Sequence, residues 1–397
     1  MPDCLLLDSM KRYARQARHP CGPAGREPGP RRGTRWRRGF AALAGLLALA
    51  AAGCSGSSPA PPAGGARPPA GEPAGATQRS GVTSGALFGG DAPLAPQAAR
   101  LGRKLAIVRV YYRFGEQFPL PRDRRLMAGG STLLVSLDSV PGRGGPSYAS
   151  IAAGRYDTLI RSFLDRVEQS AVRYHLGAIY VCFEHEANAP RHLALGTPAE
   201  FIKAWDHIHQ LAESAHLNWN QGGRLHWVLI LTHVAFTPES GRPAWAARAG
   251  QARSFWPGAN EVDIVAADGY NSGACRPGQA AGGSFVDNGT KMASPASLFG
   301  PVLSFARAHG GLPVFIAEWG SVPYSSPSEQ PSFINQMRAF VTANREIAAV
   351  LYWNSYGQHN GCDYSINGHP AALGALASMG RSPALQGRLV PGARAAG

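Results

Sequence analysis

The sequence predicts an α/β fold, a (β/α)8 TIM barrel, and three observations lead to it. Short apolar segments recur between about residues 85 and 380, and most are apolar on both faces, as strands covered on both sides are. Helical patterns separate several of these segments. Eight strands alternating with helices over roughly 300 residues are what a closed parallel barrel requires.

The eight predicted strands follow one another along the chain at residues 85–89, 105–112, 131–137, 177–184, 225–231, 262–267, 312–318 and 348–353. Residues 197–200, "TPAE", form a capping box with proline at the first helical position, and apolar residues recur behind it at helical spacing up to 212. Similar spacing at 160–171 and 333–341 precedes the fourth and eighth strands. An open doubly wound sheet is the alternative, and the barrel is preferred because no glycine-rich phosphate loop follows the first strand.

The beginning of the chain differs in composition from the predicted barrel. Residues 31–54 run from a basic stretch through about a dozen apolar residues to small residues that end in Cys54, which is the layout of a secretory signal peptide and too short for a membrane span. "AAGC" resembles a bacterial lipobox, with Ala51 at the usual leucine position, and "WRRGF" loosely resembles a twin-arginine signal. The alternative is a spurious extension before an ordinary signal, with Met10 as another possible start.

Four regions are therefore expected: a presequence with a lipoprotein signal peptide (1–53), a flexible tether (54–81), the barrel domain (82–380) and a disordered tail (381–397). The tether is rich in Pro, Gly, Ala and Ser, a composition that cannot bury a core. The protein is expected to be exported as a monomer. Lipid on Cys54 would hold it at the extracellular face of the membrane, and otherwise it would be secreted.

The net charge of +14 is divided between the presequence and the rest of the chain. Residues 1–53 carry ten Lys and Arg against three Asp and Glu, so half of the excess lies there. The remainder is only mildly basic, and the strongest basic run belongs to the export segment. Nucleic acid is therefore not an expected partner.

The cysteines outside the presequence suggest one disulfide. Cys275 and Cys362 lie in polar segments of an exported chain, which predicts a bond between them. Cys182 falls in an apolar strand and is expected to be a small buried hydrophobe. The sequence contains neither CxxC nor HExxH, so no metal and no other cofactor is expected.

Two carboxylates stand where a barrel enzyme carries its chemistry, at the carboxyl ends of strands. Glu186 ends the fourth predicted strand in "VCFEHEANAP", and Glu318 ends the seventh in "IAEWGS". Two carboxylates facing one cleft are the minimum for cleaving a glycosidic bond, one as proton donor and the other as nucleophile or base. Trp353 and Trp319 are suited to pack against a sugar ring, although the spacing of Trp353 fits the barrel core equally well.

Five segments in barrel order resemble glycoside hydrolase family 26: "LGRKLAIVRVYYRFG", "FEHEAN", "VDIVAADGYN", "IAEWG" and "VLYWN". The resemblance covers about residues 85–375. It implies a retaining mechanism with Glu318 as nucleophile and Glu186 as acid and then base. It also places His185 beside the acid, Tyr270 as hydrogen-bond partner of the nucleophile, and Arg109 as the arginine of the second strand.

The substrate is expected to be a β-linked polysaccharide or oligosaccharide, with His185, Asn188, Tyr270, Trp353, Trp319 and Arg109 in contact with it. Family mannanases follow the acid with an aromatic segment, whereas this chain has "ANAPRHLALG", which leaves mannan open. Glu184 is a rival for the acid, and Asp138 and His233 are further candidates to line the cleft. The alternative functions are an inactive carbohydrate-binding lipoprotein and a transglycosylase of the cell envelope.

Overall fold

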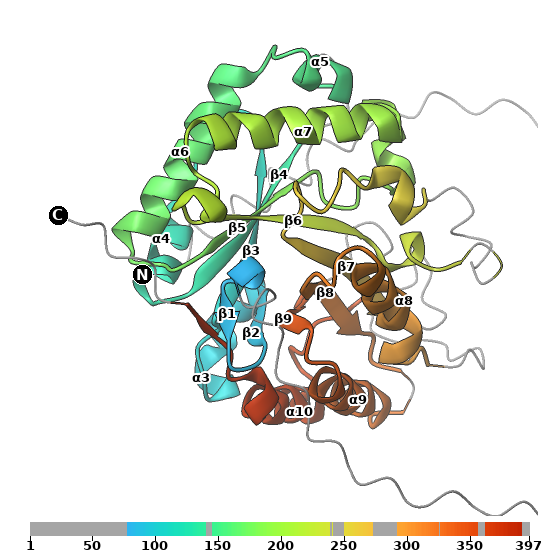
Figure 1. Cartoon of the computed structure of the whole chain (residues 1–397). Helices are drawn as coiled ribbons and strands as arrows, with labels where there is room; N and C mark the ends of the chain where they lie inside the picture. Colours follow the sequence, from blue (N-terminus) through green and yellow to red (C-terminus); the bar gives the residue numbers. More distant parts are fainter. Residues whose placement is uncertain are drawn as a thin grey trace, which may run out of the picture. The chain divides into compact units, whose positions relative to one another are not determined.

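The computed structural model describes residues 78–139, 145–238, 240, 250–272, 292–324, 326–355 and 362–390. These residues belong to one compact unit, 67–397. Eight parallel strands close into a barrel in the order β2-β3-β4-β5-β6-β7-β8-β9, and helices surround it (Figure 1). The predicted (β/α)8 fold is therefore confirmed. Within the described residues no helix is both long and apolar enough to cross a membrane.

Each barrel strand overlaps one predicted strand. The strands are β2 (Leu87–Asp91), β3 (Ile107–Arg113), β4 (Thr132–Asp138), β5 (Ile179–Phe183), β6 (Leu225–Thr232), β7 (Ile264–Asn271), β8 (Val314–Ser321) and β9 (Ile347–Tyr352). β7 and β8 continue beyond their predicted ends at 267 and 318. They do so because polar residues carry on the pairing there, with Asp268 opposite Glu318 and Asn271 opposite Ser321.

The helices are α3 (Ala98–Leu101), α4 (Pro121–Ala128), α5 (Tyr148–Ala152), α6 (Asp157–Arg173), α7 (Pro198–Ser214), α8 (Pro295–Ala308), α9 (Glu329–Ala343) and α10 (Pro370–Gly380). Short 3-10 helices are η1 (Ala92–Gln97), η2 (Pro190–Leu195), η3 (Trp219–Gln221), η4 (His233–Ala235), η7 (Ala252–Phe255) and η8 (Pro383–Leu385). α7 begins at the predicted capping box, in which Thr197 Oγ1 accepts from the Glu200 backbone N–H at 3.2 Å.

Alternation along the strands separates two apolar clusters. Ile107, Leu134 and Phe315 belong to a cluster that fills the barrel interior, whereas Val108 and Val135 pack outward against the helices. Successive side chains of a strand point to opposite faces, so the interior cluster takes every second residue. The same alternation carries polar side chains into the barrel mouth at the carboxyl ends of the strands.

A small two-stranded sheet covers the amino-terminal end of the barrel. β1 (Val82–Thr83) pairs antiparallel with β10 (Arg388–Leu389) (Figure 1). Val82 belongs to the interior cluster and Leu389 packs against it. The prediction of a disordered tail is therefore wrong for residues 381–390, because an apolar side chain on β10 covers the open end of the barrel core.

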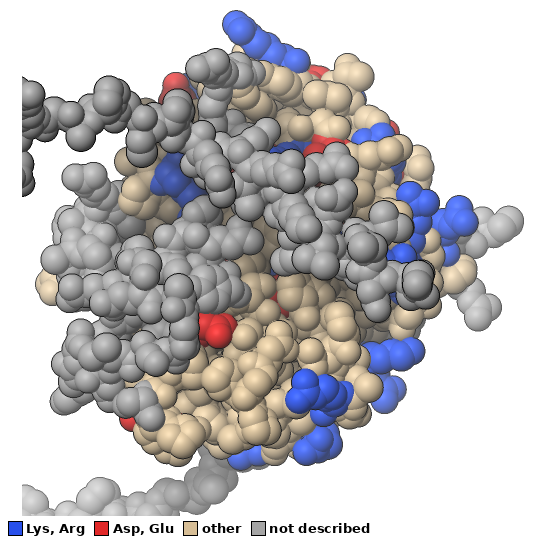
Figure 2. Space-filling view, turned by 180° about the vertical axis from the view of Figure 1, so that it is seen from behind, with Lys and Arg blue, Asp and Glu red and all other residues tan. Residues whose placement is uncertain are grey.

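The surface gives little sign of a basic patch on the side seen from behind. Figure 2 shows the described Lys and Arg side chains of that side in separate small groups around the margin of the view. Phosphate backbones are bound by continuous basic surfaces, and the described part of this face does not display one. The expectation about nucleic acid stays a prediction.

β2 and β3 approach so closely at Gly89 that a larger residue there would destabilise the fold. A Cβ on Gly89 would lie 2.2 Å from the carbonyl oxygen of Ile107, whereas one on Gly374, in α10, would meet nothing within 4 Å. We expect Gly89→Ala to lower the free energy of unfolding by about 2 kcal/mol or more. Gly374→Ala, the matched control, should raise it by about 0.5–1 kcal/mol through helix propensity. Urea unfolding measures both, and equal effects would contradict the packing argument.

Candidate active site

Polar side chains continue the inward-facing rows of the barrel beyond its apolar interior. On β3, Ile107 is followed at every second position by Arg109 and Tyr111. On β7, Ala266 is followed in the same way by Asp268 and Tyr270. Strand alternation therefore directs these groups into the mouth of the barrel, at the carboxyl ends of the strands where barrel enzymes carry their sites.

Glu318 enters this mouth because of an irregularity in β8. Ala267 pairs with Ile316 and Asp268 pairs with Glu318, so β8 carries one extra residue, Ala317, at this point. Ala317 already faces the interior, and without the bulge the next residue would face the helices. The bulge instead turns Glu318 inward, where its residue is 7% exposed.

Three side chains hold Glu318. The hydroxyls of Tyr111 and Tyr270 donate to its two carboxylate oxygens, one each. Arg109 Nη1 lies 3.0 Å from Glu318 Oε1 and 2.8 Å from Asp268 Oδ1. Both carboxylate oxygens are thereby fixed by donors on two strands of the barrel, Arg109 and Tyr111 on β3 and Tyr270 on β7.

Burial and charge set the ionisation of this cluster. Burial lowers the pKa of Arg109, but the charges of Asp268 and Glu318 outweigh it and bring that pKa well above its usual value. Burial, together with the neighbouring carboxylates, raises the pKa of Tyr111 and of Tyr270 far above their usual range. The guanidinium therefore stays charged and both phenols keep their protons as hydrogen-bond donors.

Glu186 lies just beyond β5 and is paired with a cation. Arg191 Nη2, from η2, lies 2.5 Å from Glu186 Oε2, and the Glu186 side chain is 14% exposed. Burial raises the pKa of Glu186, but the charges of Arg191 and His185 outweigh burial and hold it below its usual value. The Arg191 ion pair is the main physical reason why the pKa of Glu186 is low.

A chain of side chains connects the surroundings of Glu186 with those of Glu318. His185 Nδ1 lies 2.8 Å from Asp138 Oδ1, and the His185 ring packs edge-on against Tyr111 with centroids 5.3 Å apart. Burial lowers the pKa of His185, but Asp138 outweighs it and raises that pKa. Tyr111 in turn bonds to Glu318. The two carboxylates therefore border one mouth.

Glu184, the rival for the acid, is buried behind the site. Its side chain has no exposed surface, and Oε2 accepts from the Ser139 N–H at 2.8 Å. Burial and the charge of Asp138 raise its pKa to about 8. His192 Nε2 lies 3.6 Å from Glu184 Oε1, and burial, with Arg191 and His185, lowers the pKa of His192 to about 4. At neutral pH both partners are uncharged, so Glu184 serves the site as a neutral support.

Three predicted substrate contacts are wrong, and the first is Arg109, which is buried and bound to Asp268 and Glu318. Asn188 is fully buried, donating to Thr232 Oγ1 at 2.7 Å and accepting from the Thr232 N–H at 2.9 Å, so it ties the segment after β5 to β6. Trp319 is also fully buried and packs edge-on against Tyr352 in the outer cluster. The bulge that turns Glu318 inward turns Trp319 outward to the helices.

The remaining predicted residues lie at or beside the mouth. Trp353 is half-buried and meets the Tyr111 ring edge-on, with centroids 5.9 Å apart. His233 Nδ1 lies 3.3 Å from the Asp268 carbonyl oxygen.

Cys182 is buried and free, as expected. Cys362 is buried, and Cys275, its predicted partner, lies outside the described residues, as does Cys54.

Sequence reasoning missed four residues of the site: Tyr111, Asp268, Arg191 and His192. The alternation of side chains along a strand could have predicted Tyr111 and Asp268, because each lies two positions beyond an inward-facing residue. Arg191 and His192 carried no such signal, because they reach Glu186 through the turn of η2. In the described part of the chain no group of three His, Cys, Asp or Glu is arranged to hold a metal.

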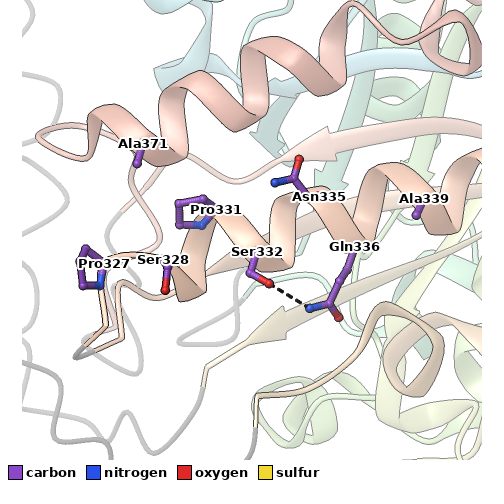
Figure 3. Close-up of a pocket in the computed structure, with 8 residues that line it drawn as sticks. All are labelled: Pro327, Ser328, Pro331, Ser332, Asn335, Gln336, Ala339 and Ala371. Atoms are coloured by element: carbon purple, nitrogen blue, oxygen red, sulfur yellow. Dashed lines mark hydrogen bonds between the residues drawn. The ribbon is translucent and has the colours of Figure 1, made fainter.

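A hollow elsewhere on the surface does not involve these groups. It has a volume of about 770 Å³ and lies over α9 and the start of α10 (Figure 3). Its lining consists of Pro327, Ser328, Pro331, Ser332, Asn335, Gln336, Ala339 and Ala371. The hollow contains no ionisable side chain, so the chemistry is assigned to the barrel mouth.

The fold and the mouth place this protein among the (β/α)8 barrels with carboxylates at the strand ends, and solved structures agree on the fold. The catalytic domain of a GH26 endo-β-1,4-mannanase from Bacillus sp. JAMB-750 is 13% identical, with a TM-score of 0.51 over 78% of this chain and 90% of that one. A GH26 β-mannanase from Bacteroides ovatus is 12% identical, with a TM-score of 0.51 over 78% and 92%. No family model and no curated protein matches the chain. At these identities the likeness establishes the fold alone.

The buried Glu184 gives stability a specific dependence on pH. Because its pKa rises from 4.5 to about 8 on folding, the unfolded chain binds fewer protons between these values and stability falls as pH rises through this window. We expect Glu184→Gln, which mimics the protonated acid, to remove this loss and to stabilise the fold at pH 8 by roughly 2 kcal/mol. Urea unfolding of both proteins at pH 5 and pH 8 tests this. A variant that loses as much stability as the wild type would contradict it.

Proposed function

We propose that this protein is a glycoside hydrolase that cleaves β-linked polysaccharide with retention of configuration. The observation that carries the proposal is the fixed carboxylate of Glu318, held by Tyr111, Tyr270 and Arg109 in a mouth that Glu186 also borders. The fold shared with family 26 mannanases supports the same class. Two carboxylates at one strand-end cleft are the equipment that this reaction needs.

Glu318 is proposed as the nucleophile. The hydrogen bonds from the two tyrosines leave the carboxylate one orientation, and Arg109 keeps a positive charge beside it. A positioned nucleophile has already lost the rotational freedom that a reaction in solution must remove. Tyr270 and Tyr111 are therefore positioning residues that hold Glu318 toward the anomeric carbon.

Glu186 is proposed as the acid and then the base. In the first step Glu318 attacks the anomeric carbon, the glycosidic C–O bond breaks, and protonated Glu186 gives its proton to the leaving oxygen. In the second step Glu186 takes a proton from water, whose oxygen displaces Glu318 from the anomeric carbon. Since Arg191 favours the ionised carboxylate, the free enzyme is poised for the second step and must gain a proton on Glu186 for the first.

Glu184 is not proposed as the acid, although its pKa of about 8 would keep it protonated. Its side chain is fully buried, and one oxygen is committed to the backbone of Ser139. A proton donor must come within hydrogen-bond distance of the leaving oxygen. Glu186 is partly exposed, which supports its choice as the proton donor.

Both carboxylates should be required for turnover. We expect Glu318→Ala and Glu186→Ala each to lower the rate of reducing-end release from β-mannan, β-1,3- or β-1,4-xylan, or mixed-linkage glucan by about 10³-fold or more. Glu213→Gln, on the exposed face of α7, is the control that should keep full activity. NMR of the first product should show the β-anomer.

Azide separates the two roles. It should restore turnover in Glu318→Ala as an α-glycosyl azide and in Glu186→Ala as a β-glycosyl azide, because azide replaces the nucleophile in one variant and water in the other. Activity that survives Glu318→Ala would sink the assignment of the nucleophile. Binding of a polymer without any release of reducing ends would favour a carbohydrate-binding lipoprotein, and longer products would favour a transglycosylase.

We also propose that the protein is exported and anchored through lipid on Cys54, which lies outside the described residues. The support is the order of basic, apolar and small residues before Cys54. We expect a lipid label to be incorporated in the wild type and lost in Cys54→Ala, with the variant released from membranes. Equal membrane association of the two proteins would contradict the anchor.

A further inference from the structure

Arg191 is the more accessible of the two arginines in the described site. Arg109 is buried and held by Asp268 and Glu318, whereas the Arg191 side chain is 40% exposed. Its Nη2 lies on Glu186 Oε2, and the Glu186 side chain is 14% exposed. Arg191 is therefore the more exposed member of this ion pair, and a leaving group that reaches Glu186 would also meet the guanidinium.

The reaction changes the charge balance at Arg191. Asp138 is paired with His185, and Asp268 and Glu318 share Arg109, so Glu186 is the counter-ion of Arg191 among the described carboxylates in contact. When Glu186 holds the proton that it donates, Arg191 loses this counter-ion. A neutral leaving group that covers the guanidinium would then leave a desolvated charge with no carboxylate in direct contact and only the more distant Asp138 and Glu318 to balance it, which is costly.

A carboxylate on the substrate removes this cost. A guanidinium presents its N–H groups in a planar fork that matches a carboxylate, and the group that Arg191 now binds is a carboxylate. The segment 187–196 that carries Arg191 has no aromatic residue on which a neutral sugar ring could pack. This segment therefore favours recognition by charge over recognition by stacking.

We infer that Arg191 binds the carboxylate of a uronic acid residue on the leaving-group side of the scissile bond, and that the substrate class is an acidic β-linked glycan. The inference rests on the proposed function. The uronate replaces Glu186 as the counter-ion of Arg191, which frees Glu186 to hold its proton. Binding of the correct substrate thus prepares the acid for the first step.

The test measures binding apart from turnover. Calorimetry on Glu318→Gln compares β-1,4-mannuronate with β-1,4-mannose oligosaccharides of equal length, and β-1,4-glucuronate with β-1,4-glucose oligosaccharides. Each pair differs only in the carboxylate at C6. We expect the uronate to bind roughly tenfold or more tightly than its neutral partner in at least one pair.

Three further variants test whether Arg191 causes the preference for the uronate. Arg191→Gln in the same background should reduce the difference to less than about twofold, since one charged hydrogen-bond donor is lost. Arg161→Gln, whose side chain is 48% exposed on α6, removes the same charge elsewhere and should leave the preference unchanged. Arg191→Lys keeps the charge without the fork and should retain part of it.

Each result supports or overturns either the inference about Arg191 or the proposed function. Equal or tighter binding of the neutral oligosaccharide in both pairs, no binding of either uronate, or a preference that survives Arg191→Gln overturns the inference. Cleavage of neutral polymers with no uronate preference overturns the inference alone. A uronate preference lost in Arg191→Gln, with no cleavage by the wild type of the neutral polymers or of the uronate oligosaccharides, overturns the proposed function alone.

Discussion

A buried guanidinium in the barrel mouth is the interaction on which the rest of the site depends. Arg109 is 1% exposed, and a charge in that position is tolerated only with close counter-ions. Asp268 and Glu318 supply them from two other strands. Loss of both partners would leave an uncompensated buried charge, a cost of about 3–5 kcal/mol. The same contacts that balance the charge therefore fix Glu318 relative to β3 and β7.

The bulge in β8 makes this arrangement possible. Regular alternation would send Glu318 toward the helices and Trp319 into the mouth, where a tryptophan would fill the space between the tyrosines. The extra residue, Ala317, reverses the two. Trp319 then packs in the outer cluster while Glu318 meets Arg109. Because of this bulge, Glu318 rather than Trp319 faces the barrel mouth.

The sequence contained the barrel and both proposed catalytic carboxylates but not their surroundings. Apolar runs mark strands directly, so all eight were found, and Glu186 and Glu318 stood out because charges rarely end such runs. Trp319 was misplaced because a bulge leaves no signature in composition. Asn188 was misplaced because its partner, Thr232, is distant in sequence. The pairing of Arg191 with Glu186 depends on the path of η2, which no local pattern fixes.

The segment after β5 shows how two identical side chains take opposite roles. Glu184 and Glu186 both have a φ of 54°, a left-handed conformation that is unfavourable for residues with a Cβ. Their backbone N–H groups bond to Leu137 and Ile230 on the neighbouring strands, and these contacts hold the strained turn. The turn buries Glu184, raising its pKa to about 8, and presents Glu186 to the mouth, where Arg191 overcomes burial and lowers its pKa. Backbone geometry, two residues apart, therefore separates a buried structural acid from the partly exposed carboxylate at the mouth.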